Sequence, residues 1–184
     1  NDTSPASYAQ LRQWFLWQLE PGSTAYHIAG ALRLTGKLDV SALEASFSAL
    51  LERHEALRTV FSADSEGALR QHVLKRGNLD YSLIDLSGCA DSDTASATDA
   101  AVRSFCESPF DLTSGPLLRI GVVRLSESNH ILTVVMHHII SDGWSMRILV
   151  DEFVGQYCQR VLGDGSENST LPIQYADYAL WQHQ

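Results

Sequence analysis

Cysteine is scarce in this chain of 184 residues. The three that are present, Cys89, Cys106 and Cys158, lie far apart in the sequence. An odd, widely spaced set supplies neither a disulfide framework nor the closely spaced ligand pairs of a zinc site. We therefore expect three reduced thiols, mostly packed, in a cytoplasmic protein.

Basic residues are also few. Lys and Arg together number 13 against 22 Asp and Glu, which gives a formal net charge of −9. A chain with this charge repels phosphate backbones, so nucleic acid is not an expected partner. The balance of 45% hydrophobic and 19% charged residues is typical of a globular domain with its own core.

Long apolar runs are missing as well. A membrane helix needs about 20 predominantly apolar residues, whereas the run Ile131–Met136 is short and contains a Thr. The start, Asn1–Pro5, has neither the basic nor the apolar part of a signal peptide. We expect no membrane partner, and the absence of an initiator Met suggests a piece of a longer chain.

Hydrophobic periodicity predicts helices and strands in an irregular order. The predicted helices are Tyr8–Leu19, Val40–Leu57, a segment that follows a loop at Ser87–Ala97 and ends near Glu107, Trp144–Leu162 and a short one from Gln174 onward. The first of them is amphipathic, with Leu11, Trp14, Phe15 and Leu19 at helical spacing. The predicted strands are Tyr26–Thr35, Arg58–Ser62, Leu69–Leu74, Tyr81–Leu86, Leu117–Leu125 and Ile131–His137. Because no regular strand–helix alternation emerges, we expect an α/β (α+β) sandwich with a mixed sheet covered by helices.

Two adjacent histidines, His137 and His138, are followed at fixed spacing by Asp142, Gly143 and Ser145. Neighbouring side chains at the end of a strand point to opposite faces, so the two imidazoles do not readily share a metal ion, and we expect no metal site. Ser145 lacks the Gly-x-Ser-x-Gly context of a nucleophile and suits a hydroxyl in the first turn of a helix.

Acid–base chemistry or charge stabilisation remains for this motif. A neutral imidazole can take a proton from an amine or hydroxyl that attacks a carbonyl. Gly143 lets the backbone approach a substrate, and its N–H precedes a helix N-terminus, where an oxyanion is stabilised. Asp142 could orient His138, pair with an arginine or simply cap the helix, and His137 suits a place in the core.

The segment His137–Ser145 matches in full the His-His-x-x-x-Asp-Gly-x-Ser signature of nonribosomal peptide synthetase condensation domains. Four further stretches resemble the other motifs of that family, in the family's order: Ser7–Trp14, Arg53–Phe61, Phe110–Arg119 and Tyr175–Trp181. Together they span nearly the whole chain, which is far more specific than the histidine motif alone.

The resemblance implies one lobe, the N-terminal half, of a chloramphenicol acetyltransferase-like fold. It divides the chain into an N-terminal subdomain at 4–162, a linker at 163–170 and, at 171–184, the start of a segment leading to a missing C-terminal subdomain. The implied partners are donor and acceptor peptidyl carrier domains and an adjacent adenylation domain. No cofactor is expected to bind directly, because the substrates arrive on the phosphopantetheine of the carriers.

The resemblance also implies roles for single residues. His138 is the catalytic histidine, either as general base or as the group that positions the amine, and Gly143 lies beside the thioester carbonyl. Asp142 forms a structural ion pair with an arginine, for which we choose Arg58 over Arg53. His137 and Ser145 support the loop, and Arg12 and Trp14 are expected to serve in packing.

The same resemblance suggests a subtype and leaves two alternatives. Met146 follows the serine where epimerisation domains usually have Trp, and the intact histidine pair excludes heterocyclisation, so we expect a domain that joins an L-donor to an L-acceptor. The alternatives are a coenzyme A-dependent acyltransferase of the same superfamily and an idle module that only docks carrier proteins. We expect this chain alone to be inactive, because half a tunnel cannot hold two pantetheine arms.

Overall fold

The computed structural model of the chain describes residues 2–141, 146–162 and 174–182. Of Asp2 and of 174–182 only the main chain is described. Two sheets and six helical segments make up this part. No helix in it combines the length and the apolar character that a bilayer crossing requires.

The larger sheet has five strands, and it carries the predicted histidine motif at one end. Its strands, in spatial order, are β5 (Asp80–Asp85), β6 (Leu118–Ser126), β7 (Asn129–His137), β2 (His27–Thr35) and β8 (Gln174–Gln182). The pair β5–β6 is parallel and the other pairs are antiparallel. This confirms the expected mixed sheet.

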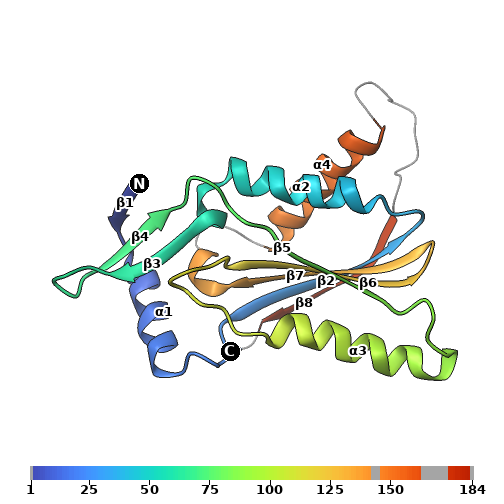
Figure 1. Cartoon of the computed structure of the whole chain (residues 1–184), viewed down its shortest axis with the longest axis horizontal. Coiled ribbons are helices and arrows are strands. Elements are labelled where there is room, and N and C mark those ends of the chain that lie inside the picture. Colours follow the sequence, from blue (N-terminus) through green and yellow to red (C-terminus); the bar gives the residue numbers. More distant parts are fainter. Residues whose placement is uncertain (1, 142–145, 163–173, 183–184) are drawn as a thin grey trace.

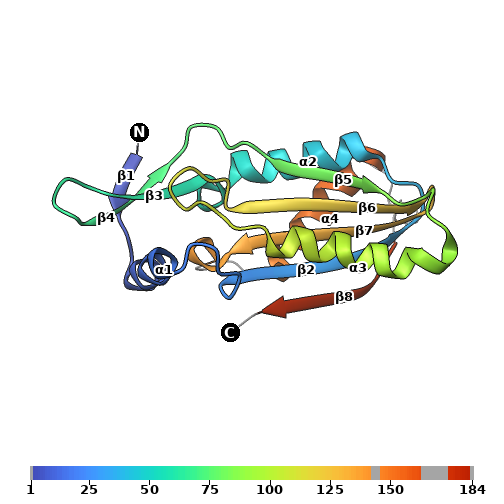
Figure 2. The same cartoon turned by 60° about the horizontal axis from the view of Figure 1, so that its bottom comes forward.

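Helices cover both faces of this sheet. Figures 1 and 2 show α2 (Val40–Arg53) and α4 (Met146–Leu162) on one face and α3 (Asp91–Glu107) on the other. Phe47 of α2 stacks on Phe153 of α4 with ring centroids 4.3 Å apart. Strand β7 is buried on both faces from Leu132 to His137, as its continuous apolar sequence predicts.

The smaller sheet stands at one end of the molecule, next to the helix α1 (Tyr8–Leu19) (Figure 1). Its strands, in spatial order, are β1 (Asp2–Pro5), β4 (Leu69–Val73) and β3 (Thr59–Ala63). Two short 3₁₀ helices complete the described part, η1 (Glu55–Arg58) before β3 and η2 (His138–Ile140) after β7. The strand β1 was not predicted, because its four residues carry no hydrophobic alternation.

Three local predictions need correction. The helix predicted to reach Leu57 ends at Arg53, because His54 is extended and a separate 3₁₀ turn follows. The segment from Gln174 is not a helix but the strand β8, which pairs with the free edge of β2, so sheet pairing overrides local propensity there. The helix α3 begins at Asp91, within the stretch that was predicted as a loop.

The helix α1 begins and ends where the sequence predicts, but its predicted apolar face does not enter the core. Ser7 and Gln10 form a capping box that starts the helix. Trp14 is buried, whereas Leu11, Phe15 and Leu19 are 46%, 62% and 71% exposed. The helix therefore packs through its tryptophan side and presents an apolar stripe outward.

Candidate functional site

The main chain is held from two sides where β7 gives way to η2. The N–H of His137 donates to the carbonyl of Leu117 at 3.0 Å, and the N–H of His138 donates to that of Tyr26 at 2.8 Å. The two imidazoles differ in burial: His137 is 2% exposed, and His138 is partly exposed. This arrangement agrees with the expectation that one histidine points into the fold and the other points away from it.

His137 is a neutral cap of the turn that carries His138. Its Nδ1 accepts the N–H of Ile139 at 3.0 Å, which requires an unprotonated Nδ1. Burial, together with the nearby His27 and His138, lowers the pKa of His137 to about 3. At neutral pH this imidazole therefore positions the backbone and carries no charge.

His27 and Phe110 pack against His137. His27 is the register partner of His137 on β2, and their ring centroids are 6.0 Å apart. The Phe110 ring lies edge-on to both imidazoles, 4.9 Å from His27 and 6.3 Å from His137. The Nδ1 of His27 is 2.8 Å from the carbonyl of Cys106, and because a carbonyl can only accept, this nitrogen carries the proton.

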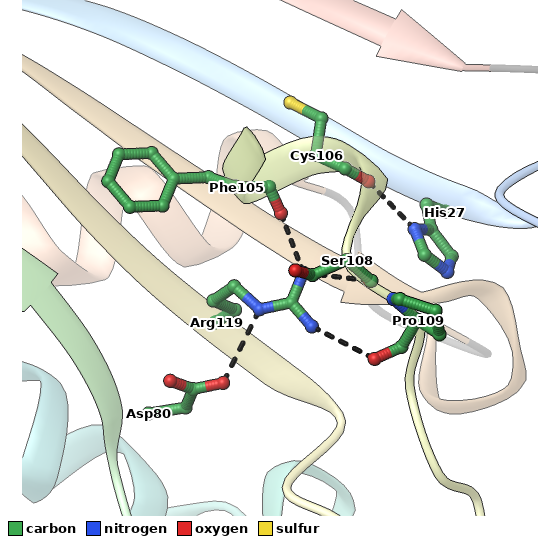
Figure 3. A network of polar contacts seen from close by, with 7 residues as sticks. All are labelled: His27, Asp80, Phe105, Cys106, Ser108, Pro109 and Arg119. Atoms are coloured by element: carbon green, nitrogen blue, oxygen red, sulfur yellow. Dashed lines mark hydrogen bonds and ion pairs between the residues drawn. The ribbon is translucent and has the colours of Figure 1, made fainter. Parts of the chain in front are cut away.

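The side chain of Arg119, on β6, binds the C-terminal end of α3 and the residues that follow it (Figure 3). Its guanidinium donates to three main-chain carbonyls at 2.6, 3.0 and 3.3 Å, those of Phe105, Ser108 and Pro109. It also forms an ion pair with Asp80 at 3.4 Å and lies 4.3 Å above the centre of the Phe110 ring. Arg119 thus fixes Phe110, which packs on His137.

The helix α1 is attached to the same segment. The indole N–H of Trp17 donates to the carbonyl of Phe110 at 3.1 Å. Trp17 in turn packs on Trp14, with ring centroids 5.2 Å apart. Phe110 therefore connects α1, the end of α3 and the end of β7, which are distant in sequence.

A cavity of about 300 Å³ lies between α1 and η2, and His138 lines it. Gln10, Arg12, Gln13 and Ser141 contribute polar side chains to the same cavity. A larger hollow of about 910 Å³ lies between α3 and the sheet, but its lining does not include His138. We place the candidate site at the smaller cavity, because it alone of the two contains the predicted catalytic side chain.

Ser141 is a residue of the site that the sequence did not single out. Its hydroxyl donates to the carbonyl of His138 at 2.7 Å, and its oxygen lies 3.4 Å from the Nδ1 of His138. Because the hydroxyl proton is engaged, this oxygen can only accept from Nδ1, which favours the tautomer with its lone pair on Nε2. The three-residue spacing within one turn was the signal that could have identified it.

The other predicted site residues are only partly described. Asp142, Gly143 and Ser145 lie outside the described residues, so the pairing of Asp142 with Arg58 stays a prediction. Arg58 ends η1 and donates to the main-chain carbonyls of Leu51 and Leu74. Nothing within the described ranges groups three His, Cys, Asp or Glu side chains around a metal position.

The three cysteines are free thiols. Cys89 is exposed, which corrects the expectation of packing for that residue, and Cys106 and Cys158 are partly buried. Burial raises the pKa of both Cys106 and Cys158. These two thiols therefore stay protonated at neutral pH and are poor nucleophiles.

Known proteins resemble this chain along its whole length, and residues 1–184 match the condensation domain family. One of the linear gramicidin synthase proteins of Brevibacillus parabrevis is 41% identical over 180 residues, covering 98% of this chain and 4% of that protein. Nonribosomal peptide synthetase dtxS1 of Metarhizium robertsii is 41% identical over 180 residues, covering 97% of this chain and 2% of that protein.

A solved structure gives the same result for the fold. The crystal structure of the starter condensation domain of rhizomide synthetase RzmA matches with a TM-score of 0.81 and 25% identity, over 92% of this chain and 40% of that one. This chain therefore spans well under half the length of the proteins it matches. It belongs to the condensation domain family of nonribosomal peptide synthetases and has the chloramphenicol acetyltransferase-like fold of that family.

Proposed function

We propose that this chain supplies the N-terminal, catalytic half of a condensation domain that forms peptide bonds. The substrates are an aminoacyl or peptidyl thioester on a donor carrier domain and an aminoacyl thioester on an acceptor carrier domain. Both are carried on phosphopantetheine, which acts here as part of the substrate, and an adenylation domain adjoins the assembly. The observation that carries the proposal is His138, which lines a cavity from a turn that His137 caps.

The reaction needs one proton to move from the acceptor to the donor. The acceptor's α-amine attacks the thioester carbonyl, the C–N bond forms, and the C–S bond breaks to release the donor's pantetheine thiol. The Nε2 of His138, left with its lone pair by the tautomer that Ser141 favours, takes or positions the amine proton. The thiolate leaving group finally receives a proton, so the charge balances.

The rest of the motif has the supporting roles that the family resemblance implies. The backbone of Gly143 lies beside the thioester carbonyl, where its N–H stabilises the oxyanion. Asp142 pairs with Arg58, and Ser145 supports the start of α4. Met146, which follows that serine, is in keeping with a domain that joins an L-donor to an L-acceptor.

The substitution His138→Ala tests the proposal in a condensation domain that contains this sequence together with its second half. With loaded donor and acceptor carrier domains, we expect dipeptide formation to fall at least about 100-fold, within the usual contribution of a general base. His72→Ala, on β4 away from the cavity, is the matched control and should keep the parent rate. Unchanged turnover in His138→Ala would contradict the catalytic role.

The chain by itself is expected to form no dipeptide with the same loaded carriers. The cavity beside His138 is about 300 Å³, too small to enclose two pantetheine arms with their aminoacyl groups. Mass spectrometry of the carrier-bound products measures the yield. Dipeptide made by the 184 residues alone would overturn this expectation, and acyl transfer from coenzyme A would favour the acyltransferase alternative.

A further inference from the structure

The cavity beside His138 contains a polar group from α1 that has no assigned role. Gln13 lines this cavity, and its side-chain oxygen is buried without a hydrogen-bond partner in the described part of the chain. A buried, unpaired acceptor is costly, so an unpaired amide oxygen on a residue that shares a cavity with His138 calls for an explanation. A ligand that donates an N–H in the cavity would provide the missing partner once the amide turns its oxygen toward that N–H.

The other polar side chains of the cavity are poorly suited to accept that N–H. The oxygen of Gln10 already accepts the N–H of Ser7 at 2.9 Å, in the capping box of α1. Arg12 has only donors. The hydroxyl oxygen of Ser141 is engaged with the backbone and ring of His138. Gln13 is thus the acceptor that remains.

We infer that Gln13 binds the attacking amine of the acceptor substrate and aims it at His138, an inference that rests on the function proposed above. A neutral α-amine has one lone pair and two N–H bonds. The lone pair must face the thioester carbonyl, one N–H faces His138, and the second N–H donates to the amide oxygen of Gln13. The terminal torsion of a glutamine is soft, so its amide can turn the oxygen to meet the amine.

The charges around the cavity suit a neutral amine. The amide of Gln13 accepts an N–H without adding a negative charge that would favour the protonated, unreactive ammonium. The guanidinium of Arg12, on the same cavity, repels an ammonium and so further favours the neutral form. Gln13 and Arg12 together therefore prepare the nucleophile that His138 acts upon.

The substitution Gln13→Met removes the amide but keeps a side chain of similar length. In the condensation domain with its second half, at saturating donor, we expect kcat/KM for the loaded acceptor carrier to fall about tenfold, the effect of about one hydrogen bond. Gln18→Met is the matched control, because Gln18 is exposed on the same helix and does not line the cavity. Its kcat/KM should stay within about twofold of the parent, the small effect expected of a surface change.

A second pair of variants separates amine binding from a structural role. Gln13→Glu places a carboxylate beside the amine, which raises the pKa of the bound ammonium, so the pH–rate profile for condensation should move to higher pH. Gln18→Glu should leave the profile in place. Gln13 variants that behave like their Gln18 counterparts in both assays would overturn the inference.

These outcomes are distinguishable from failure of the proposed function. If the parent domain forms no peptide, or if His138→Ala forms it at the parent rate, the proposed function itself is wrong. If the parent is active, His138→Ala is inactive and the Gln13 variants match the Gln18 variants, only the role of Gln13 is wrong. Thermal unfolding of each variant identifies any loss of rate that comes from misfolding. If Gln13→Glu has a reduced rate, the position of its pH–rate profile can still be compared with that of the parent.

Discussion

Acidification from pH 7 to pH 4 is expected to lower the free energy of unfolding by about 3 kcal/mol through His137 alone. The native pKa of this imidazole is about 3, and that of an unfolded histidine is 6.5. Between these values the unfolded chain binds a proton that the native state does not. The stability that neutral His137 provides is therefore complete above about pH 6.5 and is lost as the pH falls, at about 1.4 kcal/mol per pH unit.

Urea unfolding of the parent chain and of His137→Asn across this pH range measures the effect. The asparagine oxygen can still accept the N–H of Ile139, but it does not titrate. At pH 7 the variant should be less stable by about 1–3 kcal/mol, because it loses ring packing on Phe110 and His27. From pH 7 to pH 4 the stability of the variant relative to the parent should rise by about 3 kcal/mol, so that the difference closes or reverses; parallel curves would contradict the assignment.

A second pH-sensitive histidine, His130, does not obscure this comparison. Burial and the nearby Arg124 lower the pKa of His130, so that residue also destabilises the native state at low pH. His130 is present in both the parent and His137→Asn, and its contribution cancels in the difference between them. A His137 that stays neutral also leaves proton transfer at the proposed site to His138.

The sequence predicts the elements of this fold better than it predicts their contacts. The period of the apolar residues locates α1 and β7 closely, and the continuous apolar stretch of β7 indicates a strand covered on both faces. The same period predicts burial for Leu11 and Phe15 on α1, and both are exposed. A helical period identifies one face of a helix, but it does not identify what that face packs against. The helix predicted from Gln174 is wrong for a related reason, since the open edge of β2 is a tertiary feature.

The site shows the same limit. The adjacency of His137 and His138 predicts their opposite directions, because it is a property of one strand end. Phe110, Trp17 and Arg119 reach the site from segments far along the chain, so no local pattern indicates that they meet. Gln13 carries no signal of its own in the sequence, and only the cavity reveals its relation to His138.

Replacement of Arg119 by methionine is expected to destabilise the chain by about 3 kcal/mol. Methionine fills much of the same volume but donates no hydrogen bond. The buried carbonyl of Phe105 then loses its donor from this side chain, and so do the carbonyls of Ser108 and Pro109. Exchange of a buried ion pair for an apolar side chain can be neutral. Here, however, most of the hydrogen bonds of Arg119 go to backbone groups, which the substitution leaves in place.

Arg119→Lys and Arg103→Met separate the hydrogen bonds of Arg119 from its charge and its packing. Lysine keeps the charge but cannot present a planar fork to three carbonyls, so Arg119→Lys should recover only part of the loss. Arg103 lies exposed on α3, and Arg103→Met should change the free energy of unfolding by no more than about 0.5 kcal/mol. If urea unfolding gives equal values for Arg119→Met and Arg103→Met, then Arg119 does not hold the end of α3, and Phe110 must be kept against His137 by packing alone.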